Sequence, residues 1–383
     1  MRAAHERRAG RASAPAHTPE AALYRFAPSL VAAGLVVAAL GCAPGATQVV
    51  EPAATPGAPP SPTVATLPTP MATVERAAVR ALVPVAPGAW SLAVAPRLHR
   101  AYVTSRESDV VSIVDLDQNQ VVQAVSVGPD PHNVVVDEAA GRAYVTLHGG
   151  TSTQRGDAVA VLDALEGTVL AKWPTGPFPA QIDLDPVLGR LYVVNEGDGT
   201  VSLLDTADGS TVRQVKMPGQ PMDVAASVTS GRAYVTTWVG GGLVALDGRD
   251  GAVVAQTPLG PMPLRVAVNP KTERVYAADG TAPGADRGAL WTVEGWSGAT
   301  TSRPLGALPL AVAADAEADE VVVADARLGT LALLDGTGQD LRWLGAVGPA
   351  PHTLMASRAL GRAYVVISGT NALAVLDWPP AGQ

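Results

Sequence analysis

The sequence is poor in cysteine, in aromatic residues and in charge. One cysteine occurs in 383 residues, aromatic residues make up 4% of the chain and charged residues 16%. A single cysteine excludes internal disulfides, so the fold must be stabilised by packing. The net charge is −8 and no run of Lys and Arg occurs, which argues against a nucleic-acid backbone as partner. No apolar run reaches the roughly 20 residues that a membrane-spanning helix needs.

What the sequence has in abundance is glycine, proline and small aliphatic residues. The chain contains 39 Gly and 33 Pro, and its apolar residues are mostly Val, Ala and Leu. This composition is typical of a protein with many turns and short strands rather than long helices.

The first 42 residues have the features of an export signal. Several arginines precede a short apolar run, residues 30–40, and Gly41-Cys42 follows it directly. This arrangement resembles the bacterial lipoprotein signal, in which the cysteine is lipidated and becomes the mature N-terminus. Ala39 departs from that pattern, where Leu is usual. The alternative is ordinary cleavage near residues 39–46 with a free thiol at Cys42; both readings predict an exported protein, and lipidation places it on the extracytoplasmic side of a membrane.

Residues 43–72 carry eight prolines and almost no charge. Such a segment cannot bury a core and favours extended conformations. We expect a disordered linker here, which serves as a tether if Cys42 is lipidated.

A repeat fills residues 73–383. The motif Gly-Arg-Ala-Tyr-Val-Thr occurs at 141–146 and 231–236, with near-copies elsewhere. Aligning its tyrosine column gives seven positions: Tyr102, Tyr144, Tyr192, Tyr234, Tyr276, Val322 and Tyr364, at intervals of 42, 48, 42, 42, 46 and 42 residues. An acid ends a later apolar run in every copy, and a proline precedes an apolar run in six. We interpret these repeated columns as structural.

Each repeat contains four short runs rich in Val, Leu, Ile and Tyr, separated by Gly, Asp and Asn turns. This pattern predicts an all-β, seven-bladed β-propeller with four antiparallel strands per blade. The last copy holds only three strands before the chain ends. Residues 77–88 resemble a fourth strand, so we expect the N-terminal strand to complete the last blade and close the ring.

The block at 101–128 resembles the YVTN-type β-propeller repeat, and Tyr192-Val193-Val194-Asn195 comes closest to its signature. The resemblance covers residues 73–383. It implies an exported or envelope protein, related to seven-bladed lactonase-like propellers and to the propeller subunits of quinoprotein amine dehydrogenases. The sixth repeat departs from the pattern, with Val322 in place of Tyr and Glu320 in place of Arg.

The residues that follow the repeated proline should lie at the mouth of a central channel. The second of each pair is polar in six of seven copies, and the pairs differ in every blade. The candidate ligand-binding residues are Trp90, Ser91, His132, Asn133, Gln181, Asp223, Arg265, His352 and Thr353, with Trp238 on the same face. The alternative is that these groups satisfy one another, with Asp223 and Arg265 forming an ion pair across adjacent blades.

His132, His148 and His352 are of the residue type that binds transition metals. No carboxylate or cysteine joins them at ligand spacing in the sequence, so no metal site is predicted.

No nucleophile elbow, zinc-protease motif or phosphate-binding loop occurs. The leading interpretation is a non-enzymatic, envelope-anchored, monomeric propeller that binds a small ligand or a protein partner at the channel mouth. The alternative is an enzyme of the lactone hydrolase type or a propeller subunit of a quinoprotein dehydrogenase. No cofactor is indicated.

Overall fold

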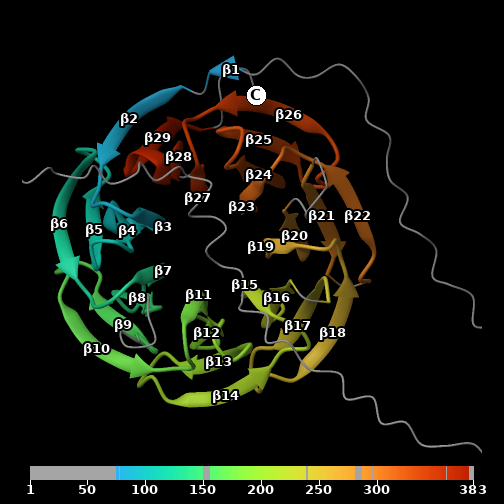
Figure 1. Ribbon diagram of the computed structural model, residues 1–383, viewed down its shortest axis with the longest axis horizontal. Coiled ribbons are helices and arrows are strands. Elements are labelled where there is room, and N and C mark those ends of the chain that lie inside the picture. Colours follow the sequence, from blue (N-terminus) through green and yellow to red (C-terminus); the bar gives the residue numbers. More distant parts are fainter. Residues whose placement is uncertain are drawn as a thin grey trace, which may run out of the picture. The chain divides into compact units, whose positions relative to one another are not determined.

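The computed structural model describes residues 75–76, 78–149, 156–238, 240–280, 287–295, 297–358 and 360–378. The proposed signal, Cys42 and the linker 43–72 lie outside these residues. The described residues form seven antiparallel sheets of four strands arranged as blades in a ring (Figure 1), and one of these sheets gains a fifth strand. The predicted seven-bladed β-propeller is confirmed.

The strands of each blade follow one another along the chain, from the centre of the ring outward. Blade 1 consists of β3 (Ala89–Ala95), β4 (Arg100–Ser105), β5 (Val110–Asp115) and β6 (Gln120–Ser126). Blade 2 consists of β7 (Pro131–Asp137), β8 (Arg142–Leu147), β9 (Ala158–Asp163) and β10 (Val169–Pro174). Blade 3 consists of β11 (Pro179–Asp185), β12 (Arg190–Asn195), β13 (Thr200–Asp205) and β14 (Thr211–Lys216). Blade 4 consists of β15 (Pro221–Ser227), β16 (Arg232–Thr237), β17 (Gly242–Asp247) and β18 (Val253–Pro258).

The remaining blades repeat this order. Blade 5 consists of β19 (Pro263–Asn269), β20 (Arg274–Asp279), β21 (Ala289–Glu294) and β22 (Thr300–Pro304). Blade 6 consists of β23 (Pro309–Asp315), β24 (Glu320–Asp325), β25 (Thr330–Asp335) and β26 (Leu341–Ala346). Blade 7 consists of β27 (Pro351–Ser357), β28 (Arg362–Ile367) and β29 (Ala372–Asp377), with β2 (Val79–Pro84) as its outer strand. Two short 3-10 helices, η2 (Pro96–Leu98) and η3 (Ser368–Thr370), lie in connecting loops.

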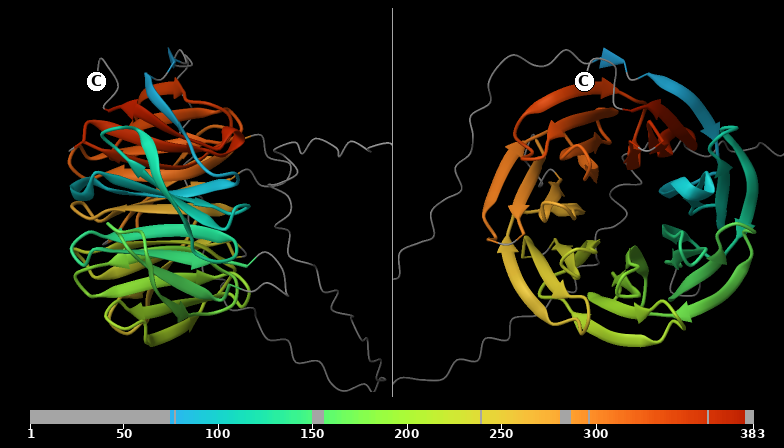
Figure 2. Two further views of the ribbon diagram at one scale, coloured as in Figure 1. Left: turned by 90° about the vertical axis from the view of Figure 1, so that its left-hand side faces the viewer. Right: turned by 180° about the vertical axis from the view of Figure 1, so that it is seen from behind.

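The ring closes as the sequence predicts. Strand β2 pairs antiparallel with β29, from Val79 opposite Leu376 to Pro84 opposite Ala372. The Asn371 side chain reinforces this closure, because its Oδ1 accepts hydrogen bonds from the N–H groups of Gly88 (2.9 Å) and Ala89 (3.2 Å). Figure 2 shows β2, in blue, completing the ring beside the red strands of blade 7.

An additional strand was not expected from the sequence. Strand β1 (Glu75–Arg76) pairs in parallel with Gly345 and Ala346 of β26 in blade 6. Its two residues carry no apolar pattern that would have marked them as a strand.

Burial follows the position of each strand within its blade. The second and third strands are almost entirely buried, whereas outer strands such as β6 and β14 expose most of their side chains. Five of the repeated tyrosines, Tyr102, Tyr144, Tyr192, Tyr276 and Tyr364, are among the largest fully buried side chains. The sheets therefore bury both faces of their middle strands against neighbouring blades, which explains the near-continuous Val, Ala and Leu runs.

The repeated residues hold the scaffold together. Asp115 Oδ1 accepts hydrogen bonds from the N–H groups of Asp117 and Gln118, both at 2.9 Å, and Arg100 pairs with the same carboxylate. The Tyr276 hydroxyl donates to the carbonyl of Gly336 in the next blade at 2.6 Å. The structural role that we assigned to the repeated acid and tyrosine columns is confirmed at these positions.

One end of the ring, which we call the mouth face, is defined by a hydrogen bond repeated in all seven blades. The residue after the second strand donates its N–H to the carbonyl of the residue before the first strand. The pairs are Arg106–Gly88, His148–Asp130, Glu196–Phe178, Trp238–Gln220, Gly280–Met262, Ala326–Leu308 and Ser368–Ala350, at 2.8–3.1 Å. The loop that precedes the first strand and the loop that follows the second strand therefore open on the same face. Residues 150–155 and 281–286 of the two longer loops lie outside the described residues.

No helix in the described part of the chain has the length and apolar character that crossing a membrane requires.

Candidate functional site

The inner wall of the ring is built from the first strand of each blade, and every one of these strands is irregular at the mouth face. The register with the second strand shifts just after the repeated proline, as between Pro221 and Asp223 or Pro263 and Arg265. Such bulges redirect side chains at the end of a strand. They set the orientation of the residues that we expected to line the mouth.

In blades 1 to 3, the polar residues that we expected at the channel mouth form hydrogen bonds with one another. The Ser91 hydroxyl donates to Asn133 Oδ1 at 2.7 Å, and Asn133 Nδ2 donates to Gln181 Oε1. In blade 7, the Thr353 hydroxyl donates to the Trp90 carbonyl at 3.0 Å. These four candidate residues thus connect neighbouring blades.

The expected ion pair between Asp223 and Arg265 does not form. Asp223 Oδ1 accepts from the N–H of Val224 at 2.9 Å and its Oδ2 from the N–H of Val266 at 3.0 Å, while Arg265 donates to the Leu264 carbonyl. One of these N–H groups belongs to the same strand and the other to the next blade, and together they take the place of the guanidinium. Burial raises the pKa of Asp223 to about 6, although the charge of Arg265 and the two N–H donors oppose the rise.

A second inner-wall carboxyl group was missed in the sequence. Asp183 of β11 is half-buried, and its Oδ2 accepts from the N–H of Ala226 in the next blade at 2.7 Å. Burial raises the pKa of Asp183 to about 7, with the charge of Asp223 adding to the effect and two N–H donors opposing it. Asp183 is two residues beyond Gln181, on the same side of an extended strand.

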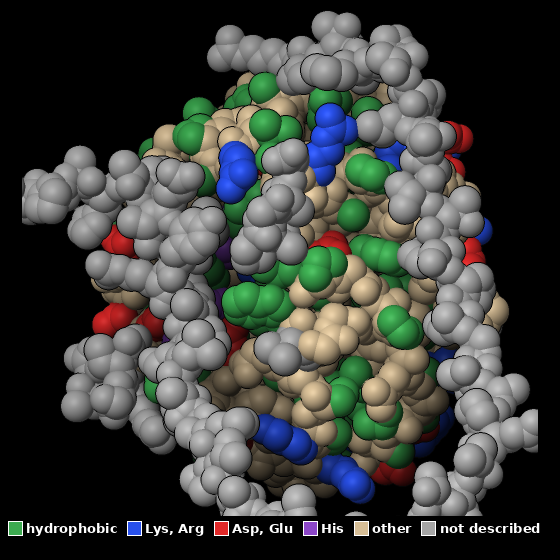
Figure 3. All heavy atoms as spheres, turned by 45° about the vertical axis from the view of Figure 1, so that its right-hand side comes forward, with side chains coloured by type: hydrophobic (Ala, Val, Ile, Leu, Met, Phe, Trp, Pro, Cys, Tyr) green, Lys and Arg blue, Asp and Glu red, His purple; other side chains and the backbone are tan. Residues whose placement is uncertain are grey.

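An arc of aromatic and imidazole rings runs along the mouth face from blade 7 to blade 3. The Trp90 ring centroid is 3.8 Å from that of His352 and 5.5 Å from that of His132. His132 stacks on His148 at 5.4 Å, and His148 lies 5.3 Å from Phe178. We call these five residues the ring arc. Figure 3 shows histidine atoms (purple) beside acidic side chains (red) on the part of the surface in view.

Four ionisable residues lie along the ring arc, and we call them the charged cluster: Arg106, Asp130, His148 and Glu196. Arg106 lies over the Trp90 ring at 4.6 Å and binds Asp130 with two hydrogen bonds, of 2.5 and 2.9 Å. His148 lies between two carboxylates, with Nδ1 3.3 Å from Asp130 Oδ2 and Nε2 3.6 Å from Glu196 Oε2. These four residues come from the loops of three consecutive blades.

The environment shifts the pKa values of the three histidines in different directions. Burial lowers the pKa of His148, but the neighbouring carboxylates of Asp130 and Glu196 favour its protonated form and outweigh burial, so the net pKa is raised. Burial, together with nearby positive charge, holds the pKa of His132 well below its usual value and lowers that of His352 to about 3. His132 and His352 are therefore neutral near neutral pH, whereas the environment of His148 shifts its equilibrium toward the protonated form.

Two features define the hydrogen-bonding capacity of the neutral histidines. His352 Nδ1 lies 2.9 Å from the Trp90 carbonyl, which fixes the proton on Nδ1 and leaves the lone pair on Nε2. His132 is 4% exposed and its Nδ1 has no hydrogen-bond partner. An unpaired buried polar atom costs about 1–3 kcal/mol, so this nitrogen has unused hydrogen-bonding capacity.

The three histidines do not form a metal centre. Carboxylates do reach His148, which the sequence spacing did not suggest, but within the described ranges no group of three or more ligands has metal-binding geometry. The ion pairs of His148 are with Asp130 and Glu196 instead.

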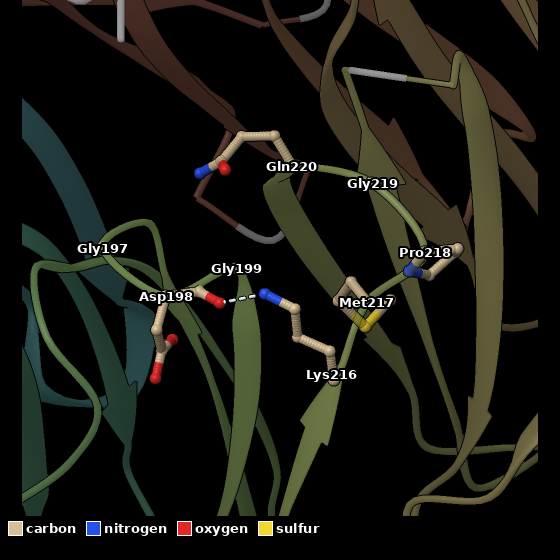
Figure 4. Close-up of a pocket in the computed structure, with 8 residues that line it drawn as sticks. All are labelled: Gly197, Asp198, Gly199, Lys216, Met217, Pro218, Gly219 and Gln220. Atoms are coloured by element: carbon tan, nitrogen blue, oxygen red, sulfur yellow. Dashed lines mark hydrogen bonds between the residues drawn. The ribbon is translucent and has the colours of Figure 1, made fainter. Parts of the chain in front are cut away.

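Trp238 lies on the mouth face of blade 4, where its N–H bonds to the carbonyl of Gln220. A shallow hollow of about 530 Å³ lies nearby between blades 3 and 4 (Figure 4). Glycine backbone, Lys216 and Gln220 line much of it, and Lys216 Nζ donates to the carbonyl of Asp198. The Gln220 amide donates to the Glu196 carbonyl at 2.9 Å, so the hollow adjoins the charged cluster.

The mouth face is asymmetric around the ring. The position after the second strand is occupied by Arg106, His148, Glu196 and Trp238 in blades 1 to 4, but by Gly280, Ala326 and Ser368 in blades 5 to 7. Aligning this column in the sequence would have revealed the asymmetry. Arg106, Asp130, Phe178 and Glu196 are not among the residues that follow the repeated proline, so they were not predicted as site residues.

The fold and this face define a seven-bladed β-propeller with a one-sided polar and aromatic mouth. No family model matches the chain, and no curated protein sequence does. Among solved structures, it is similar to hydrazine synthase of Kuenenia stuttgartiensis, with a TM-score of 0.68 and 16% identity, over 77% of this chain and 96% of that one. It is also similar to virginiamycin B lyase from Staphylococcus aureus, with a TM-score of 0.61 and 11% identity, over 76% of this chain and 94% of that one. At these identities the likeness concerns the fold.

Proposed function

We propose that this protein is an exported, lipid-anchored β-propeller that binds a small ligand or a protein partner through the mouth face of blades 7, 1, 2 and 3. The observation that carries the proposal is the concentration of uncommon residues there. The chain has six histidines, of which three belong to the ring arc, and two phenylalanines, of which one belongs to it. Scaffold residues recur in every blade, whereas these do not, so the repeat itself does not require them.

Export and anchoring are supported by the sequence before the ring. The arginine-rich start, the apolar run and Gly41-Cys42 resemble a lipoprotein signal, and the repeat resembles the YVTN type found in envelope proteins. The proline-rich linker of residues 43–72 would separate the ring from the membrane surface.

An enzyme of the lactone hydrolase type is the second candidate. It is favoured by the convergence of Arg106, Asp130, His148 and Glu196, since acidic and basic groups within reach of one another are what general acid–base chemistry needs. The two structural neighbours carry the names of enzymes, a synthase and a lyase. A propeller subunit of a quinoprotein dehydrogenase would require a partner subunit in addition.

The binding proposal is tested by an unbiased thermal-shift screen followed by affinity measurements on His148→Gln. We expect the best ligand to bind this variant at least about tenfold more weakly, a loss of about 1.4 kcal/mol. His99→Gln is the matched control, because His99 also contacts a carboxylate, Asp117 Oδ1 at 2.9 Å, but lies in the loop between β3 and β4 at the opposite end. Equal affinities of both variants and the parent would move the site away from this face.

Anchoring is tested by Cys42→Ser. We expect the variant to leave the membrane fraction and become soluble in the envelope or the medium, because the acyl chains attach at this sulfur. Mass spectrometry of the parent should show a lipidated N-terminal cysteine. An unmodified mature N-terminus at another residue would contradict the anchor.

A further inference from the structure

The charged cluster of the mouth face indicates which class of ligand the proposed site would bind. Among the described residues, the Glu196 carboxylate contacts one basic side chain, that of His148, whose Nε2 lies at 3.6 Å, which is longer than a hydrogen bond. Its side chain is 24% exposed, compared with 11% for Asp130, which Arg106 binds through two hydrogen bonds. Glu196 is therefore the carboxylate of this cluster that remains accessible to an incoming cation.

The surroundings of Glu196 suit an apolar body next to that cation. The N–H of Glu196 bonds to the Phe178 carbonyl at 3.0 Å, which places the two residues side by side. Gly197 packs directly on the Phe178 ring, since a Cβ there would lie 2.6 Å from ring Cδ2. An aromatic ring beside a carboxylate is a favourable environment for an organic cation.

The neighbouring histidine adds an uncharged hydrogen-bonding group. His132 stacks on His148, and its Nδ1 is buried without a partner. A neutral imidazole can accept a hydrogen bond from an ammonium group without repelling it. An anion would meet the opposite situation, because the guanidinium of Arg106 is already bound by Asp130, and Glu196 and Asp198 follow on the next loop.

From this arrangement we propose that the mouth face binds an organic cation, a protonated amine joined to an apolar or aromatic body, with Glu196 as its ion-pair partner, Phe178 beside it and His132 as a hydrogen-bond acceptor. This inference rests on the proposed binding function and specifies its ligand class.

The test compares two probes of similar shape, benzylamine and benzyl alcohol, by ligand-observed NMR titration of the folded protein. Benzylamine is a cation at neutral pH and benzyl alcohol is not. We expect benzylamine to bind at least about tenfold more tightly than benzyl alcohol, and Glu196→Gln to remove that preference. The control is Glu166→Gln, which removes the same charge from an exposed turn between β9 and β10 at the opposite end and should leave both affinities unchanged.

His132→Phe provides a second variant, because it keeps a ring in the stack and removes both nitrogens. We expect it to weaken benzylamine binding several-fold and to leave benzyl alcohol unaffected. Benzylamine that binds no more tightly than benzyl alcohol, or equally well to Glu196→Gln, would overturn the inference. A neutral or anionic ligand from the thermal-shift screen whose binding still depends on His148 would leave the proposed function intact and refute only the cation.

Discussion

Deletion of residues 73–86 should abolish cooperative unfolding of the propeller. This segment contains β2, which supplies the outer strand of blade 7 and pairs with β29 along its length. Without it, β29 presents a row of unpaired backbone groups, and buried Val83 is lost from the core between blades 7 and 1. We expect aggregation, or a broad thermal transition in place of a single sharp one, measured by circular dichroism and calorimetry.

Deletion of residues 43–70 is the matched control for this truncation. It removes a longer segment that we expect to make no contribution to the core, so the melting temperature should stay within about 2 °C of the parent, which in a domain of this size corresponds to a change of only about 1 kcal/mol. Equal melting behaviour of the two truncated proteins would show that the N-terminal strand does not stabilise the ring.

Restoring the repeat consensus in blade 6 should destabilise the protein. Glu320 occupies the place of the repeated arginine, and its side chain is 5% exposed. Arg342 Nη1 lies 2.6 Å from Oε1 and Arg358 Nη2 2.6 Å from Oε2, while Arg358 Nε also bonds Asp315 at 3.0 Å. Glu320→Arg would bring three guanidinium groups together in a buried position.

Breaking a buried ion pair typically costs about 3–5 kcal/mol, and we expect a loss of at least this size on thermal or denaturant unfolding. Glu320→Gln keeps an acceptor oxygen and removes only the charge, so its loss should be smaller. Glu317→Arg, an exposed residue of the same blade, should change stability by no more than about 0.5 kcal/mol. A Glu320→Arg variant as stable as the parent would mean that the consensus arginine fits this position after all.

The fold was predictable because its information is local and repeated. The tyrosine column, the turn acids and the missing strand of the last repeat are each read from short segments, and the tertiary contacts agree with them. Strand β1 was not predictable, since a parallel pairing of only two polar residues leaves no pattern in the sequence.

The sequence indicated where on the ring the candidate residues lie, but not which side chains contact one another there. The residues after the repeated proline do lie at one end of the inner wall, and Trp90, His132 and His352 do meet there. The Asp223–Arg265 pair was wrong because the backbone of β19 competes for the carboxylate, a geometry that depends on the bulge. Arg106, Asp130 and Glu196 belong to three different loops, and only the packing of adjacent blades brings them to His148.

The most direct test of the binding site is hydrogen–deuterium exchange of the protein with and without the best ligand of the thermal-shift screen. We expect slower exchange on binding in peptides that contain residues 105–109, 130–133, 146–149 and 195–199, with no change in the loops at the opposite end. Protection confined to blades 5 and 6, or to the opposite end of the ring, would contradict a binding site at the ring arc.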